Sequence, residues 1–151
     1  MDHRQHRVIV AWKPVAQPRH QFRCVRTKTF PPKMFAQAYL PDDHPIHDYK
    51  AAVMRAWRKS DAVMMEGAIR ADLVFTFATK RKKDWGLFKI TKPDLDNLEK
   101  AVLDALTDAG AFRDDAQVVM VAKAKFWGEF DSTSIALSPL HFDAFHALET
   151  K

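Results

Sequence analysis

The chain has 151 residues, of which 47% are hydrophobic and 11% aromatic. This composition excludes an intrinsically disordered protein and predicts one folded domain over residues 1–151. A formal net charge of +5 favours a polyanionic partner such as nucleic acid, although many basic proteins bind none. The single cysteine, Cys24, excludes an internal disulfide. Because no apolar run resembles a signal peptide or a membrane span, we expect a cytoplasmic protein without a membrane partner.

The first third of the chain is rich in proline and in cations. Residues 8–12 form a short apolar run that predicts a first strand. Prolines then recur, so residues 1–45 are expected to include a basic, irregular arm with short extended pieces such as 22–25. We expect Arg19 and Arg23 in this arm to contact DNA. A basic surface loop without a DNA contact explains the same pattern equally well.

The middle of the chain predicts a helix followed by a strand. Helical spacing of apolar residues, beginning at Tyr49, indicates a helix over about 46–59. Strict alternation over 69–77 indicates a half-buried strand, and 85–91 reads as a further extended piece. The loop between them carries a basic run that could hold phosphates, although such runs are usually only solvated: Lys80, Arg81, Lys82 and Lys83.

A second helix is expected over about 97–109, with carboxylates at both ends. Asp96 fits the N-cap position, Glu99 completes a capping-box pattern, and Gly110 suits the helix stop. If the chain from Asp94 to Asp96 is extended, both carboxylates point to one side. The acidic pair at 114–115 follows the helix and precedes a strand over 117–126, whose even-numbered apolar face is expected to be buried.

Carboxylates in this arrangement suit a divalent cation. Mg²⁺ prefers hard oxygen ligands and keeps several waters, so Asp94, Asp96 and Asp115 would suffice as ligands, with Lys100 reaching toward a phosphate. Each acidic pair alone is more often a cap or a turn, and it is their combination that favours a metal. The helix separates its ends by roughly 20 Å, so an extended return just reaches Asp94 within one chain, and we favour that arrangement. A second subunit that completes the site is the other possibility.

One stretch matches a known pattern. The sequence PDLDNLEKAVLDAL, followed by DDAQVV, resembles the signature of the RusA family of crossover (Holliday) junction endodeoxyribonucleases of bacteria and their prophages. The resemblance extends more weakly to the arm around Gln17–Arg23, to Ala38-Tyr39, to the strand 69–77, and to Lys123 and Lys125. We expect these two lysines to bind DNA. It implies a small α+β homodimer that cuts four-way DNA junctions symmetrically with Mg²⁺ or Mn²⁺ in recombination and repair. By resemblance, the metal-binding aspartates are Asp94, Asp96 and Asp115, and the catalytic lysine is Lys100. The role of Asp114 stays open.

These observations predict a single α+β domain. We expect a mixed or mainly antiparallel sheet, the helices 46–59 and 97–109 packed on it, an edge strand near 133–137 and an amphipathic tail helix within 139–151. Two matched incisions in a junction favour a homodimer with two equivalent sites. Two other functions stay open: a non-catalytic module that binds branched DNA around a structural cation, and a nuclease that prefers other branched DNA.

Overall fold

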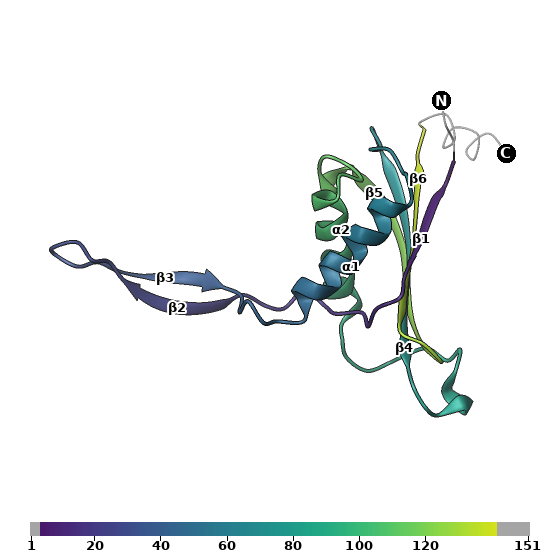
Figure 1. Cartoon of the computed structure of the whole chain (residues 1–151), viewed down its shortest axis with the longest axis horizontal. Helices are drawn as coiled ribbons and strands as arrows, with labels where there is room; N and C mark the ends of the chain where they lie inside the picture. The colour runs from purple at the N-terminus through teal and green to yellow at the C-terminus, as the bar shows by residue number, and fades with distance from the viewer. Residues whose placement is uncertain (1–3, 142–151) are drawn as a thin grey trace.

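The computed structural model describes residues 4–141. A sheet carries two helices on one face, and a long hairpin projects away from this body (Figure 1). The fold is therefore α+β, with a mixed sheet and two main helices, as predicted. The elements in chain order are β1 (His6–Val10), β2 (Gln21–Arg26), β3 (Met34–Tyr39), α1 (Ile46–Lys59), β4 (Ile69–Ala78), the 3-10 turn η1 (Lys82–Asp84), α2 (Leu95–Asp108), the 3-10 turn η2 (Asp115–Gln117), β5 (Val118–Gly128) and β6 (Ser132–Pro139).

The main sheet has the order β1-β6-β4-β5. β4 and β5 run parallel, with α2 in the connection between them, and the other pairs are antiparallel. The expectation of an edge strand near 133–137 is wrong, because β6 lies between β1 and β4. Full burial of Ile135 and Leu137 follows from this central position. β5 is an edge of the sheet instead.

Both helices bury one face against the sheet. α1 spans the predicted residues, and Tyr49 and Trp57 on its inner face are almost completely buried. α2 begins two residues earlier than predicted, so Asp94 rather than Asp96 occupies the N-cap position. No side chain caps this helix, and Glu99 is committed elsewhere, so the predicted capping box is wrong. Gly110 has a φ of +81°, which confirms the predicted stop.

The two parallel strands differ in how well their burial was predicted. β4 alternates between buried and less buried residues as expected. In β5 the even-numbered face is not buried, since Met120 and Ala122 are exposed. The opposite face, with Val121 and Lys123, turns toward α2 and the core. The prediction failed because β5 is an edge strand and its inward face contains lysines that form internal contacts.

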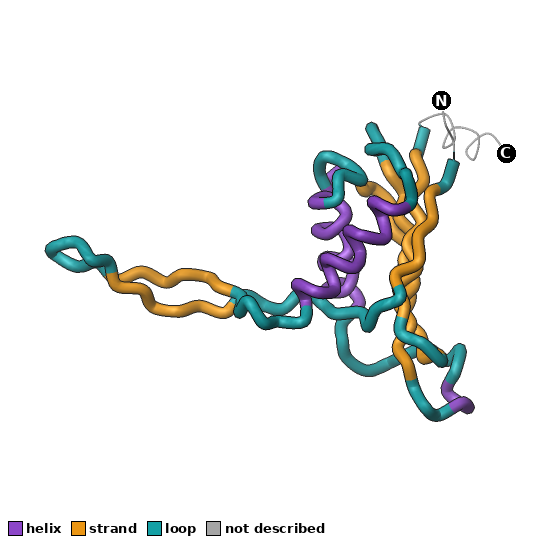
Figure 2. Tube along the Cα trace, in the orientation of Figure 1, coloured by secondary structure: helices purple, strands orange, loops and turns teal. Residues whose placement is uncertain are grey.

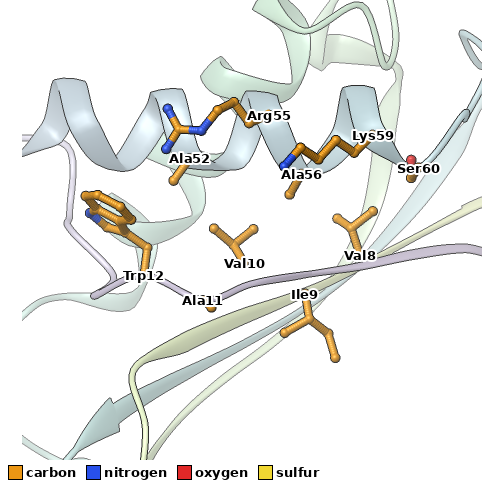
Figure 3. Close-up of a pocket in the computed structure, with 10 residues that line it drawn as sticks. All are labelled: Val8, Ile9, Val10, Ala11, Trp12, Ala52, Arg55, Ala56, Lys59 and Ser60. Atoms are coloured by element: carbon orange, nitrogen blue, oxygen red, sulfur yellow. The ribbon is translucent and has the colours of Figure 1, made fainter.

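A groove runs between β1 and α1 at the other edge of the sheet (Figure 3). Val8 and Val10 point toward the helix, whereas Ile9 points away from it. The Arg55 guanidinium lies 5.9 Å from the centre of the Trp12 ring. These contacts attach β1 to α1 and complete the core at this edge.

The proline-rich segment is more regular than predicted. β2 and β3 pair along their whole length to form a hairpin that projects from the body (Figure 2). The predicted extended piece 22–25 is confirmed within β2, and the arm is irregular only outside the two hairpin strands. Prolines occupy the tip and the flanks of the hairpin, where they cost no ladder hydrogen bonds. Residues 85–91 form no strand and make one isolated bridge, from Phe88 to Phe126. Most of the predicted tail helix lies beyond residue 141, outside the described residues.

Candidate active site

The start of α2 presents the first predicted metal ligand on a loop. Asp94 has extended backbone angles (φ −72°, ψ 140°), and its carboxylate is half-buried. The Lys92 ammonium donates hydrogen bonds to both of its oxygens, at 2.6 Å each. This bonding holds the pKa of Asp94 below its usual value, and the charges of Lys125 and Arg19 act in the same direction. Asp94 is therefore an ionised, hard oxygen donor.

Two lysines hold the loop that leads into Asp94. Lys125 on β5 donates to the carbonyls of Thr91 and Pro93, at 2.6 and 2.7 Å. The buried Lys89 donates to the Thr91 hydroxyl at 2.6 Å and to the carbonyl of Lys92. Burial lowers the pKa of Lys89, and the charge of Lys125 lowers it further. These bonds fix the backbone immediately before the metal-ligand candidate.

Asp96 and Lys100 lie on the first turns of α2. The Asp96 carboxylate is exposed and forms no ion pair or hydrogen bond within residues 4–141. The Lys100 ammonium lies 3.5 Å from Asp104, which is also 3.5 Å from Lys50. Lys100 is more than half exposed, so a weak surface pair of this kind leaves it able to reach a phosphate.

The second acidic pair divides into a structural and an available carboxylate. Asp114 accepts a hydrogen bond from the main-chain N–H of Ala116, and Gln117 completes a capping box around η2. Asp115 opens η2, is exposed, and has no side-chain partner in the described part of the chain. The doublet therefore supplies one turn-forming group and one free oxygen donor.

The three candidate ligands do not meet within one chain. Asp94 and Asp96 lie at the start of α2, and Asp115 lies beyond its end, roughly 20 Å away along a helix of 14 residues. β5 gives a similar separation, because Lys125 contacts the Asp94 loop while Asp115 precedes the far end of that strand. Among residues 4–141 no three acidic, histidine or cysteine side chains form a metal-binding group. The convergence that we favoured within one chain is thus wrong, because the chain returns from α2 directly into β5.

Comparison with known proteins decides the family. The family model described as "Endodeoxyribonuclease RusA" matches residues 11–138, which is most of the chain. This chain belongs to the RusA endodeoxyribonuclease family. It is also 33% identical over 70 residues to the "Crossover junction endodeoxyribonuclease rusA" of Lactococcus phage r1t, a match that covers 46% of this chain. The alignment spans about half the length of that relative (53%).

The cations that we expected to bind DNA in this RusA-family chain differ in their surroundings. Arg19 is exposed and close enough to influence Asp94. Arg23, on the hairpin, bonds Gln37 and lies over the Tyr39 ring. Lys123 and Lys125 both have internal partners, Glu99 and the loop carbonyls, and each would have to give these up to bind a phosphate.

The basic run after β4 remains the most open of these cationic groups. Lys80 and Lys83 are exposed, Arg81 pairs with Asp84 at 3.2 Å, and Lys82 lies 5.9 Å from the centre of the Trp85 ring. Main-chain bonds from Thr79 to Gly128 and from Gly86 to Trp127 fix both ends of this loop to the end of β5. The run therefore lies at the end of β5 that also holds the Asp94 loop.

The sequence did not predict the contacts of two residues near this site. Lys89 is buried, with 7% of its surface exposed. It lies in a segment whose sequence suggests a surface loop, and the pattern of neighbouring residues does not indicate burial. Gln17 donates from its main-chain N–H to the carbonyl of Asn97 at 2.9 Å, which attaches the N-terminal segment to the first turn of α2. Within residues 4–141 no helix is long and apolar enough to span a membrane.

Proposed function

We propose that this protein is a metal-dependent endonuclease that hydrolyses phosphodiester bonds at four-way DNA junctions, in recombination and repair. The observation that carries the proposal is the RusA family match over residues 11–138. The phage relative, whose name specifies crossover junctions, supports the substrate. The half-buried Asp94 and the exposed Asp96 and Lys100 at the start of α2 supply chemistry that fits this reaction.

Asp94, Asp96 and Asp115 would hold the metal. All are hard oxygen donors, which suits Mg²⁺, with Mn²⁺ as the alternative. A bound ion of this kind activates a water and stabilises the charge on the scissile phosphate. Lys100 would add positive charge to the phosphate from one turn further along the helix. Lys92 bonds this carboxylate of Asp94 and lowers its pKa, and a bound cation would have to replace the ammonium.

A second copy of the chain would bring the ligands together. In a two-fold dimer the same surface of each subunit meets its counterpart. A strand that lies across the axis is therefore antiparallel to its copy, and its first residues lie beside the last residues of that copy. If two β5 edges pair antiparallel across such an axis, Asp115 of one subunit approaches the loop that Lys125 holds in the other. Two equivalent sites result, one for each incision.

The surface of β5 supports this arrangement. The edge is open along its first half, and Val119 and Met120 next to Asp115 are 63% and 36% exposed. Near the Asp94 loop, Phe88 and Ile90 are 69% and 92% exposed. Exposed apolar groups at both ends of the proposed interface would be covered in the dimer. An unpaired strand edge also invites pairing with a second strand.

DNA would cross the basic end of the body. The run Lys80–Lys83 and Arg19 lie near the Asp94 loop, and phosphate contacts from such groups position DNA without reading its sequence. The projecting β2–β3 hairpin, with Arg23 on its surface, would contact a second arm of the junction.

The test is incubation of the purified protein with a labelled synthetic four-way junction, with and without Mg²⁺. Paired nicks placed symmetrically across the branch, only with metal, are the expected result. Binding without cutting under Mg²⁺ and Mn²⁺ would instead identify a non-catalytic branched-DNA-binding module. Faster cutting of flaps or three-way branches would identify a nuclease of other branched DNA.

A further inference from the structure

A cavity of about 770 Å³ adjoins the candidate active site. Lys92 and Pro93, which lead directly into Asp94, form part of its wall. Gln17 forms another part, and its main chain is bonded to the first turn of α2 at Asn97. The volume lies within the range of pockets that hold small organic ligands. Any group in this cavity would lie next to a strand bound at Asp94.

The wall of the cavity includes an amide whose oxygen lacks a donor. Among residues 4–141, the buried side-chain oxygen of Gln17 has no hydrogen-bond partner. A buried polar atom left in this state costs free energy, which a ligand with an N–H group would recover. The opposite end of the same amide offers two N–H donors. An amide with this pairing capacity matches the edge of a nucleobase, which presents donors and acceptors side by side.

The rest of the wall suits a nucleotide. Phe77 and Trp127 supply aromatic surface, and Lys13 supplies positive charge for a phosphate. Lys92 also lines the cavity, with its ammonium bonded to Asp94. Lys89 also lines the cavity, but its ammonium is already bonded to the loop and lies 4.5 Å from the centre of the Trp127 ring. Asp131 is the one carboxylate that the described part of the chain contributes to the wall, and it accepts the main-chain N–H of Ala78 at 2.8 Å.

We propose that this cavity, the Gln17 pocket, receives one unpaired base of the DNA strand that is bound at Asp94. This inference rests on the proposed function and adds a reason for branch selectivity. A base inside a duplex must be unpaired and unstacked before it enters a pocket, at a cost of a few kcal/mol. Base pairs at a branch point are less constrained, so a junction supplies the base at lower cost than a linear duplex.

The test uses binding rather than cutting as its main readout. The fluorescent base 2-aminopurine replaces each base beside the branch in turn, and the protein is added in EDTA so that the DNA stays intact. Wild-type protein should raise the fluorescence at one position as that base leaves the stack. Gln17→Leu removes the amide, and Ala78→Phe fills the cavity from its wall, so each should reduce the rise several-fold. Gln5→Leu, at an exposed site, should leave the rise unchanged.

Cutting rates provide the second readout. Gln17→Leu should slow junction cutting roughly tenfold, the effect of losing one buried hydrogen-bonded contact. Ala78→Phe, which excludes the base from the cavity, should slow cutting at least as much. An abasic site at the position that responds in fluorescence should slow cutting by the wild type by a similar factor. In either variant the abasic site should reduce the cutting rate little further. Thermal melting establishes that the variants fold, and either one alone suffices for the test.

The outcomes separate the two proposals. A fluorescence rise that depends on Gln17, without cutting in Mg²⁺ or Mn²⁺, would support the pocket and overturn the nuclease function. Cutting without a rise at any position, or an equal rise in the folded variants, would overturn the pocket and leave the nuclease function in place.

Discussion

The ammonium of Lys92 lies 2.6 Å from both carboxylate oxygens of Asp94. The carboxylate that the proposed metal would bind is thus already paired with a positively charged side chain. The pair extends the ionised range of Asp94 to lower pH, since it holds the pKa of this carboxyl below its ordinary value of 3.8. It also means that a cation must replace an ammonium to reach this ligand.

Replacing this lysine should ease metal binding. Lys92→Met is expected to lower the Mg²⁺ concentration for half-maximal cutting several-fold, because no ammonium competes for Asp94. The pKa of Asp94 should rise toward 3.8, and carbon-13 NMR of its carboxyl measures this. The pKa of Asp94 is lower in the folded state than in the unfolded state. The pair's contribution to stability is therefore fully present above the unfolded-state pKa and is lost as pH falls through the folded-state pKa. Lys59→Met, at an exposed lysine in the last turn of α1, is the control, and an equal change there would refute the competition.

Asp96→Asn should abolish cutting while junction binding persists. The change removes a charged metal ligand but leaves shape and helix position intact, and it lessens repulsion between the protein and DNA phosphates. Cutting should fall by at least a hundredfold, with binding equal or tighter in gel-shift assays. Asp48→Asn is a matched control, since Asp48 lies in the first turn of α1 and is also exposed. Retained cutting in Asp96→Asn would exclude this residue as a ligand.

Tyr49 should contribute to stability through one buried hydrogen bond. Its hydroxyl lies 2.7 Å from that of Thr133, and both residues are buried. Tyr49→Phe leaves the threonine hydroxyl without its partner, which should lower the free energy of unfolding by about 1–2 kcal/mol. Urea denaturation measures this value. Adding Thr133→Val should cost less than the sum of the single changes, since neither hydroxyl then remains, and full additivity would argue against the pair.

Local patterns predicted the elements that local interactions determine. Helical spacing predicted α1, and alternation predicted β4, because in both a buried face repeats with the period of the element. Gly110 marked the end of α2 because its positive φ favours glycine. The acidic motif placed Asp94, Asp96 and Lys100 on one helix start, and the structure agrees with that grouping.

Features set by distant residues could not be predicted in this way. β6 looked like an edge strand because nothing in its own sequence shows that β1 pairs along its outer side. The hairpin was hidden because its strands are exposed on both faces and so lack alternation. The inward lysines of β5 looked solvated, and only Glu99 and the loop carbonyls explain their position. The separation of Asp115 from Asp94 likewise depends on the path of the chain after α2.

The hairpin should serve DNA binding rather than folding. β2 and β3 pair with each other and project from the body, so few core contacts depend on them (Figure 1). Gln21 and Tyr39 are cross-strand partners, about 5 Å apart, and a short glycine–serine linker can replace residues 22–38. The melting temperature should change by only a few degrees, and junction affinity should fall at least tenfold. A large loss of stability would show that the hairpin supports the fold.

Mixed dimers provide a direct test of a site shared between subunits. Asp96→Asn and Asp115→Asn should each be inactive as homodimers, because every site lacks one ligand. When the two are denatured together and refolded, a mixed dimer contains one site with Asp94 and Asp96 from one chain and Asp115 from the other. That site has all three carboxylates, whereas the other site of the dimer lacks the carboxylates of both residue 96 and residue 115. Mixing should therefore restore nicking of one strand, without the paired incision.

A site formed within one chain predicts a different result, because each subunit of the mixed dimer would still lack a ligand and cutting would stay absent. Mixing Asp94→Asn with Asp96→Asn is the matched control. Both changes lie at the same end of α2, so every shared site lacks a ligand and no activity should return. Analytical ultracentrifugation establishes that dimers form in each mixture. Restoration in the control as well would show exchange or contamination rather than a shared site.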